Sequence, residues 1–254
     1  MIYLNKNNTE WVSEKEWLEK VLAEIRKQLD EKRNYKERFR KDYMETHKEM
    51  WDDIGSVSIS NGLDQVVDFM QFINSTKMQK RSHEFTRKLE EKYEQMLSSP
   101  YFGRMDFIEN NDDEVEKFYI GISNLINEDY DFLVYDWRAP VSSMFYEYEI
   151  GKAKYECPEG IINGKINLKR QYKINNGKVE YMFDSDINIE DDVLQEILGK
   201  STDNKMKAIV TTIQREQNQV IRNEEYKNLI VQGPAGSGKT SVALHRIAYL
   251  LYKH

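Results

Sequence analysis

The sequence contains few of the residues that cross-link chains or break helices. Its single cysteine, Cys157, excludes an intramolecular disulfide framework and a zinc site built from several cysteines. All four prolines lie at or beyond residue 100, and the only glycines before that point are Gly55 and Gly62. Because glycine and proline disfavour helix interiors, the first hundred residues are predicted to be helical with one break.

Long apolar runs and a basic charge excess are also missing. No run approaches the ~18 residues of a membrane-spanning helix, and the first residues lack the apolar segment of a signal peptide. These absences predict a cytoplasmic protein with no membrane partner. The net charge of −7 argues against nonspecific coating of nucleic acid, although it allows a local basic groove. Charged residues make up 32% of the chain, which indicates that part of it is elongated and solvated.

Apolar residues recur at helical spacing through the first zone of the chain. Their register predicts one long helix over Ser13–Trp51, about 55 to 60 Å in length. Two later apolar stripes, at 66–73 and 85–96, predict further helices that lead the chain back toward the start of the first helix. The residues that define the first stripe are Leu18, Leu22, Ile25 and Leu29.

The simplest arrangement of these stripes is a long antiparallel helical hairpin, a coiled-coil arm over residues 1–99. Its tip would be residues 52–64, which begin with the neighbouring carboxylates Asp52 and Asp53. The pattern alone favours a structural spacer or a dimerisation coil. The mixed charges between Arg26 and Asp42 would then form its solvated face.

Residues 100–185 consist of short segments rich in tyrosine, phenylalanine, valine and isoleucine, separated by turn signals. They predict a small antiparallel β region. Asn163-Gly164 and Asn176-Gly177 are predicted hairpin turns, because both central positions of a type I′ turn need positive φ. The predicted strands are Lys117–Ile122, Phe132–Asp136, Met144–Tyr148, Ile166–Ile174 and Lys178–Phe183.

Residues 186–254 predict the start of a P-loop α/β domain, which makes the overall fold class α+β. Helices are expected near Ile189–Leu198 and Lys205–Asn223. A buried strand is expected at Asn228–Val231 and a further helix at Lys239–His254. The order of strand, loop and helix is the context that a phosphate-binding loop requires.

The loop between that strand and helix matches the pattern G-x-x-x-x-G-K-[ST], which arises by chance in a chain of this length roughly once in a hundred. Its glycines let backbone N–H groups turn inward on phosphate oxygens. Lys239 is predicted to reach the β- and γ-phosphates of ATP, and the Thr240 hydroxyl is predicted to coordinate Mg²⁺. The predicted nucleotide-binding residues here are Gly233, Pro234, Ala235, Gly236, Ser237, Gly238, Lys239, Thr240 and Ser241.

A complete P-loop ATPase also needs an acidic Mg²⁺ ligand at the end of another strand. Phe132–Asp136 imitates such a strand, but it lies far upstream, so Asp136 is interpreted either as a metal ligand or as ordinary sheet. The chain ends 14 residues after Thr240. The expectation is therefore the N-terminal piece of a longer protein, with no ATP hydrolysis by this piece alone.

Upstream of the loop, residues 213–218 read Ile-Gln-Arg-Glu-Gln-Asn, and Gln217 precedes Gly233 by 16 positions. This spacing resembles the Q motif and first motif of superfamily 1 helicases of the UvrD/Rep type. The resemblance implies a RecA-like domain in which Gln217 reads adenine. In many members an arginine follows the Lys-Thr pair of the loop; here Ser241 takes that place.

Several blocks in the same order resemble the HelD family of helicase-like ATPases, which bind bacterial RNA polymerase and recycle stalled complexes. The blocks are Ser99–Asp106, Tyr119–Ile122, Phe132–Ser143 and Leu168–Gln171. The resemblance implies an N-terminal coiled-coil arm that enters the polymerase secondary channel. A rod of about 55 Å could carry Asp52 and Asp53 toward a metal-centred active site; a solvated turn is the competing interpretation.

Four other side chains have two interpretations each. Lys169, Arg170 and Arg138 belong either to a polymerase or nucleic-acid surface or to ordinary sheet edges. His245, on the helix after the loop, is expected to pack in the core rather than to take part in catalysis.

The preferred hypothesis is the N-terminal part of an ATP-driven factor that remodels RNA polymerase complexes. A UvrD/Rep-like DNA helicase that moves along single strands is the first alternative, and it would need a basic, aromatic-lined groove. A nonenzymatic coiled-coil adaptor with a vestigial loop is the second. Gln217 and the complete loop argue against the adaptor.

Overall fold

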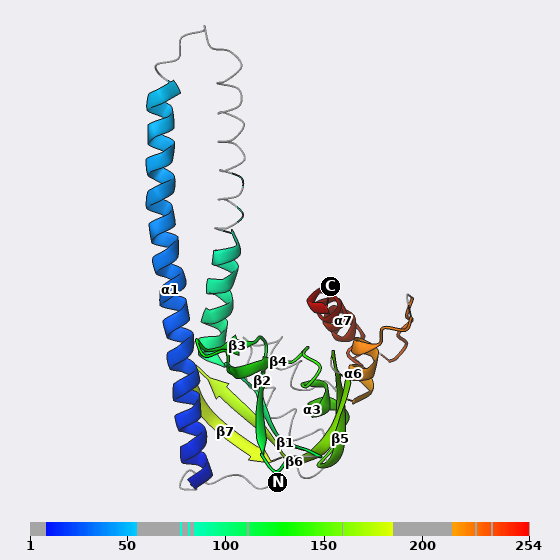
Figure 1. Ribbon diagram of the computed structural model, residues 1–254. Coiled ribbons are helices and arrows are strands. Elements are labelled where there is room, and N and C mark those ends of the chain that lie inside the picture. Colours follow the sequence, from blue (N-terminus) through cyan, green and yellow to red (C-terminus); the bar gives the residue numbers. More distant parts are fainter. Residues whose placement is uncertain are drawn as a thin grey trace. The chain divides into compact units, whose positions relative to one another are not determined.

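The part of the chain that the structure describes contains one long helix, a mixed β-sheet and several shorter helices (Figure 1). The computed structural model describes residues 9–54, 77, 81, 84–110, 112–158, 160–184, 215–226, 228–234 and 236–253. The chain divides into two compact units. Leu22–Leu97 forms the arm unit, and Met1–Val21 with Ser98–His254 forms the sheet unit. The domain boundaries predicted at residues 99 and 185 stay predictions.

Helix α1 runs without interruption from Thr9 to Ile54. Its 46 residues contain no glycine or proline, and they give a length of about 69 Å. All four residues of the predicted apolar stripe are buried. The helix extends beyond the predicted end at Trp51 because the first helix breaker is Gly55. Asp52 and Asp53 therefore belong to its last turn, whereas the sequence analysis placed them in a connecting segment.

Within the arm unit, α1 has contacts with a second helical stretch at residues 84–98. Gln28 accepts a hydrogen bond from Tyr93 at 2.8 Å, and Lys36 forms an ion pair with Glu90 at 2.6 Å. The later residue of α1, Lys36, pairs with the earlier residue of the second stretch, Glu90, so the two stretches run antiparallel. The segment that would join them, including most of the predicted tip, lies outside the described residues. The complete hairpin therefore stays a prediction.

The sheet unit is built on seven strands, in the order β3-β4-β2-β1-β6-β5, with β7 also paired to β6. One pair, β2 with β4, is parallel and the other pairs are antiparallel, so the sheet is mixed rather than wholly antiparallel. The strands are β1 Gly103–Glu109, β2 Glu116–Gly121, β3 Leu125–Ile126, β4 Phe132–Asp136, β5 Gly151–Cys157, β6 Gly160–Asn175 and β7 Lys178–Asp184.

One of the two predicted hairpin turns is confirmed and the other is wrong. Asn176 and Gly177 have φ of 48° and 70° and join β6 to β7. Gly164, by contrast, is buried inside β6, where it pairs with Glu109 of β1 and Ala153 of β5. A Cβ at Gly164 would lie 2.2 Å from a backbone oxygen, so the glycine permits close strand approach rather than a turn.

The strand predicted at Met144–Tyr148 is also wrong, because this segment forms the short helix α3 at Ser143–Glu147. Successive amides after Pro140 donate to carbonyls three residues earlier, beginning with Ser142 to Ala139 at 3.1 Å and Ser143 to Pro140 at 3.0 Å. A proline at the start of such a turn has the φ that a helix requires. Met144 and Phe145 are buried beside the sheet.

Helices α6 at Arg215–Arg222 and α7 at Lys239–Lys253 complete the sheet unit. The described structure has no strand at Asn228–Val231, contrary to the prediction. Ile230 is 94% exposed. A strand needs a neighbouring strand for its backbone hydrogen bonds, and no described strand lies beside this segment. The predicted helix near residues 189–198 lies outside the described residues.

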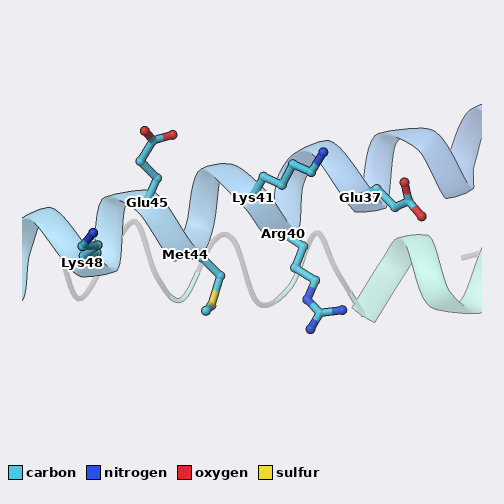
Figure 2. A pocket seen from close by; sticks show the side chains of 6 residues that line it. All are labelled: Glu37, Arg40, Lys41, Met44, Glu45 and Lys48. Carbon is cyan, nitrogen blue, oxygen red and sulfur yellow. The ribbon is translucent and has the colours of Figure 1, made fainter.

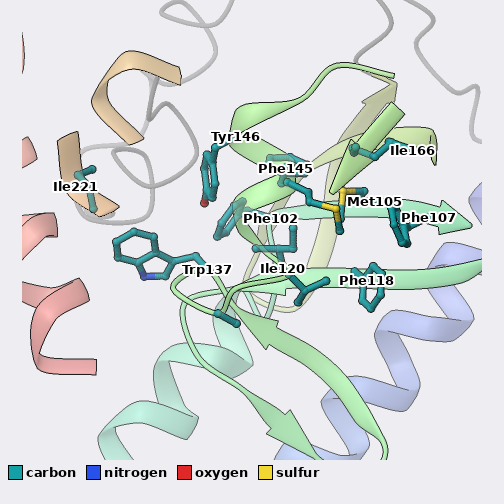
Figure 3. Close-up of a cluster of buried hydrophobic side chains, with 14 of the residues drawn as sticks. Phe102, Met105, Phe107, Phe118, Ile120, Trp137, Phe145, Tyr146, Ile166 and Ile221 are labelled. Atoms are coloured by element: carbon teal, nitrogen blue, oxygen red, sulfur yellow. The ribbon is translucent and has the colours of Figure 1, made fainter. Parts of the chain in front are cut away.

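One hydrophobic core joins the sheet to α3, α6 and α7 (Figure 3). Met105, Ile120 and Ile166 supply its sheet side and are fully buried. Figure 3 shows Ile221 of α6 and Trp137 on the same side of the cluster. Burial of each large apolar side chain contributes about 1.5–3 kcal/mol, so the helices that carry the candidate site are fixed by the same core as the sheet.

Candidate nucleotide site

The loop at residues 233–240, of which the structure describes all but residue 235, contains two glycines in the left-handed region. Gly236 and Gly238 have φ of 84° and 77°, a region that side chains other than glycine disfavour. A Cβ on Gly233 would lie 2.6 Å from Ser237 Oγ, so a larger residue does not fit there without rearrangement. Left-handed residues of this kind are typical of loops whose successive N–H groups face one anion.

Lys239 begins α7 and folds its side chain back over the loop. Its ammonium donates to the Gly233 carbonyl at 2.9 Å and to the Pro234 carbonyl at 2.6 Å. Thr240 follows it in the first turn and is exposed. The first N–H groups of a helix have no acceptor within the helix, and they favour a bound anion.

Gln217 lies next to the loop, although it precedes Gly238 by 21 positions. A Cβ added to Gly238 would lie 3.2 Å from Gln217 Nε2. The fold thus brings the predicted base-reading glutamine to the glycine that comes directly before the loop lysine. No ligand contact tests the assignment of either residue, and both stay predictions.

The described residues suit the phosphates of a nucleotide: two left-handed glycines, a helix N-terminus and one ammonium converge on a single loop. The Thr240 hydroxyl is an exposed oxygen that suits Mg²⁺. Asp136 does not offer a second Mg²⁺ ligand. It is 1% exposed, and its two carboxylate oxygens accept hydrogen bonds from Arg138 at 2.6 and 2.8 Å. The interpretation of Asp136 as part of the sheet is therefore the correct one.

The basic residues considered for a binding surface are mostly internal. Arg170 is 1% exposed and Lys169 is 7% exposed. Arg170 forms ion pairs with Glu10 at 2.5 Å and with Glu14 at 3.2 Å, both on the first turns of α1. The Lys169 ammonium donates to the Tyr148 carbonyl at 2.7 Å. Neither residue offers a free surface to a polymerase or to nucleic acid.

The same buried network continues to β1. Arg104 donates to Asp106 through two nitrogens, at 2.5 and 2.6 Å, and it also pairs with Glu14. Tyr119 donates to Glu14 at 3.2 Å. Glu14 thus bridges two arginines in the interior, a role that sequence spacing gave no sign of.

His245 packs in the core, as predicted. It is 3% exposed, its ring centroid lies 5.4 Å from that of Trp137, and its Nδ1 lies 2.6 Å from the Ser241 carbonyl oxygen. The side chains of Asp52 and Asp53 lie outside the described residues, so their predicted role at the arm tip stays untested.

Figure 2 shows a group of mostly charged side chains along α1 in the arm unit. They line a depression of about 830 Å³ that carries charges of both signs, and Met44 is its apolar member. The lining residues are Glu37, Arg40, Lys41, Met44, Glu45 and Lys48. This mixture fits the solvated helix face that the sequence predicted, and it favours no ligand of one charge.

Polar contacts that no sequence motif indicates hold α6. Arg222 donates to the carbonyls of Trp137, Arg138 and Ala139 at 2.5, 3.1 and 3.4 Å. Burial lowers the pKa of its guanidinium, and the nearby tyrosines Tyr146 and Tyr249 oppose that shift. Carbonyl partners carry no sequence signature, so residue types alone could not have revealed these contacts.

Residues 11–226 match the family model described as DNA helicase IV HelD, N-terminal domain. The chain belongs to this family. The resemblance found in the sequence blocks is thereby confirmed. A search of curated proteins finds no match.

The HelD N-terminal match covers most of α1, the whole sheet and α6. It includes Gln217 and Arg222 but stops before the loop at 233–240. The nucleotide assignment of that loop therefore rests on its own residues and geometry. No helix in the described ranges combines the length and apolar character needed to cross a membrane.

Proposed function

We propose that this chain is the N-terminal part of a HelD-type, ATP-driven motor that binds RNA polymerase and recycles stalled complexes. The observation that carries the proposal is the approach of Gln217 to Gly238 beside a loop with two left-handed glycines. The family match supports a helicase-type parent. ATP binding, polymerase binding and recycling are inferences from these observations.

In this proposal the loop N–H groups and the Lys239 ammonium hold the triphosphate, and Lys239 exchanges its contacts with the Gly233 and Pro234 carbonyls for phosphate oxygens. Thr240 holds Mg²⁺, and Gln217 recognises adenine. A bound nucleotide would supply the phosphoanhydride bond whose cleavage drives domain movement. The described residues supply binding and orientation.

An apolar surface next to the loop supports the idea that further α/β structure packs here. Leu244, Ile247 and Leu251 of α7 are between 55% and 77% exposed. Ile230 and its neighbours, just before the loop, are exposed in the same way. Adjacent strands of a parallel sheet would cover such a strand-like segment and helix face. The remaining catalytic groups would come with those strands.

A hydrolysis assay tests whether this chain binds nucleotide without hydrolysing it. Purified chain of this length should release phosphate from Mg²⁺-ATP no faster than its Lys239→Ala variant. A rate that exceeds background and disappears in Lys239→Ala would overturn the proposal that this part only binds nucleotide.

The polymerase role has its own test in the arm. Asp52→Ala with Asp53→Ala should reduce transcript release from stalled polymerase, while circular dichroism shows the same helix content. Release at the wild-type level would contradict a role for these carboxylates. Loss of binding with retained fold would support the arm as the polymerase contact.

The family description also names a DNA helicase, which favours translocation on single strands as the second candidate function. A motor of that kind would bind single-stranded DNA with strong dependence on salt. A titration of labelled single-stranded DNA separates the two functions. Tight, salt-sensitive binding without polymerase binding would favour the helicase.

A further inference from the structure

The segment from Trp137 to Glu147, between β4 and β5, binds both helices of the candidate site. Toward α6, three consecutive carbonyls at 137–139 accept hydrogen bonds from Arg222. Glu147, at the end of the segment, accepts a hydrogen bond from Asn218 Nδ2 at 3.1 Å. Asn218 in turn accepts from Arg222 Nε at 3.1 Å. The polar face of α6 is therefore anchored at two points one helical turn apart.

Toward α7, the same segment makes a second set of contacts. The Trp137 ring packs against His245, and Arg138 Nη1 donates to the Ala248 carbonyl at 3.4 Å. The Arg138 guanidinium lies 4.6 Å from the centre of the Tyr252 ring. Helix α7 begins at the loop lysine, so these contacts fix the helix that carries the phosphate cradle.

The two helices are also joined directly. Arg246 of α7 donates to the Val220 carbonyl at 2.7 Å and to the Asn223 carbonyl at 2.6 Å. Ile221 and Val242 belong to the same buried cluster. The relative placement of α6 and α7 is therefore held both by these direct contacts and by the segment 137–147, which binds each helix.

We propose that Asn218 and Arg222 are positioning residues that set the distance between Gln217 and the phosphate loop. The inference rests on the proposed function, since it concerns recognition of the nucleotide base by Gln217. Gln217 precedes Asn218 on the same short helix, and Asn218 is fully buried in the network. Hydrogen-bond recognition demands placement within about 0.5 Å, so release of α6 from residues 137–147 weakens base recognition before it weakens phosphate binding.

The test compares three probes: ATP, GTP and inorganic tripolyphosphate, which lacks a base. The variants are Asn218→Ala and Arg222→Lys, with Gln217→Ala as the reference for lost base recognition. Gln219→Ala is the matched control, because Gln219 is an exposed residue of the same helix. Thermal unfolding by circular dichroism verifies the fold of each variant.

In the wild-type chain ATP should bind more tightly than GTP. Asn218→Ala and Arg222→Lys should each reduce that preference by about fivefold, the effect of one net hydrogen bond. Tripolyphosphate affinity should stay within about twofold, and Gln219→Ala should behave as wild type. A wild-type preference retained in both folded variants would overturn the inference, as would equal losses for ATP and tripolyphosphate.

Binding by the wild-type chain separates this inference from the proposed function on which it rests. A wild-type chain that binds neither ATP nor tripolyphosphate would contradict nucleotide binding itself. A wild-type chain that binds ATP and GTP equally well would overturn base recognition, and the positioning role with it, while phosphate binding would stand.

Discussion

Glu14 of α1 and Arg170 of β6 lie 156 positions apart in the sequence, and their charged groups approach within 3.2 Å in the interior of the sheet unit. Both side chains are 1% exposed. Glu14 also pairs with Arg104, so one carboxylate from the first turns of α1 contacts two arginines of the sheet. Asp106 and Asp184 are further carboxylate partners of these arginines.

This relationship predicts that Glu14→Gln destabilises the chain by about 1.5–3 kcal/mol, because it removes a buried, charged hydrogen-bond acceptor from two arginines that keep Asp106 and Asp184 as partners. Urea unfolding followed by circular dichroism measures the change. Glu16→Gln, an exposed position on the same helix, serves as the control and should change stability by less than about 0.5 kcal/mol. Equal effects of the two substitutions would contradict the network.

The hairpin between β6 and β7 gives a second prediction. Gly177 has φ of 70°, so Gly177→Ala should destabilise the fold by about 1 kcal/mol. Asn176→Gly, at the neighbouring position with φ of 48°, should be nearly neutral, because glycine adopts that conformation freely. Chemical denaturation of both variants distinguishes turn strain from a general effect of altering the loop.

Tyr155 of β5 provides a prediction for alkaline pH. Burial raises its pKa to about 12, with further contributions from Glu116 and Cys157. Because the pKa of Tyr155 is higher in the folded than in the unfolded chain, the tyrosine contributes to the free energy of unfolding below about pH 10, the pKa in the unfolded chain. That contribution is lost as the pH rises toward 12.

Compared with Tyr155→Phe, the wild-type chain should therefore lose stability between pH 10 and 12. Urea midpoints of the two proteins at pH 8 and at pH 11 measure the difference. A constant difference across that range would show that Tyr155 ionises equally in the folded and unfolded states.

The sequence pattern correctly predicted the helix, strand and turn whose structure depends on neighbouring residues. The strand predicted at Phe132–Asp136 has the observed bounds, and the turn at Asn176-Gly177 follows from the φ that two residues prefer. The long helix followed from an apolar stripe without breakers. In each case the deciding interactions lie within a few residues of sequence.

The sequence was least informative where distant partners decide the structure. Gly164 looked like a turn residue, but Phe107 and the Ile108 carbonyl of β1 require a glycine at that position. Arg170 was interpreted either as part of a binding surface or as an ordinary sheet edge, but it is buried, and its partners Glu10 and Glu14 are more than 150 positions away. No single-sequence pattern records such pairs.

Only part of the candidate site could be predicted from the sequence. The loop at 233–240 and Gln217 have a sequence signature, because phosphate and base recognition need particular residue types at fixed spacing. The segment 137–147 acts on α6 mainly through backbone carbonyls, which every residue carries. Its contribution became visible only in the folded chain.

Calorimetric titration with Mg²⁺-ATP measures whether the loop at 233–240 binds ATP. Lys253→Ala is the matched control, since Lys253 lies at the far end of α7 and pairs with Glu224. Wild type and Lys253→Ala should show saturable binding at one site, and Lys239→Ala should show none. Binding by Lys239→Ala with unchanged affinity would contradict the assignment.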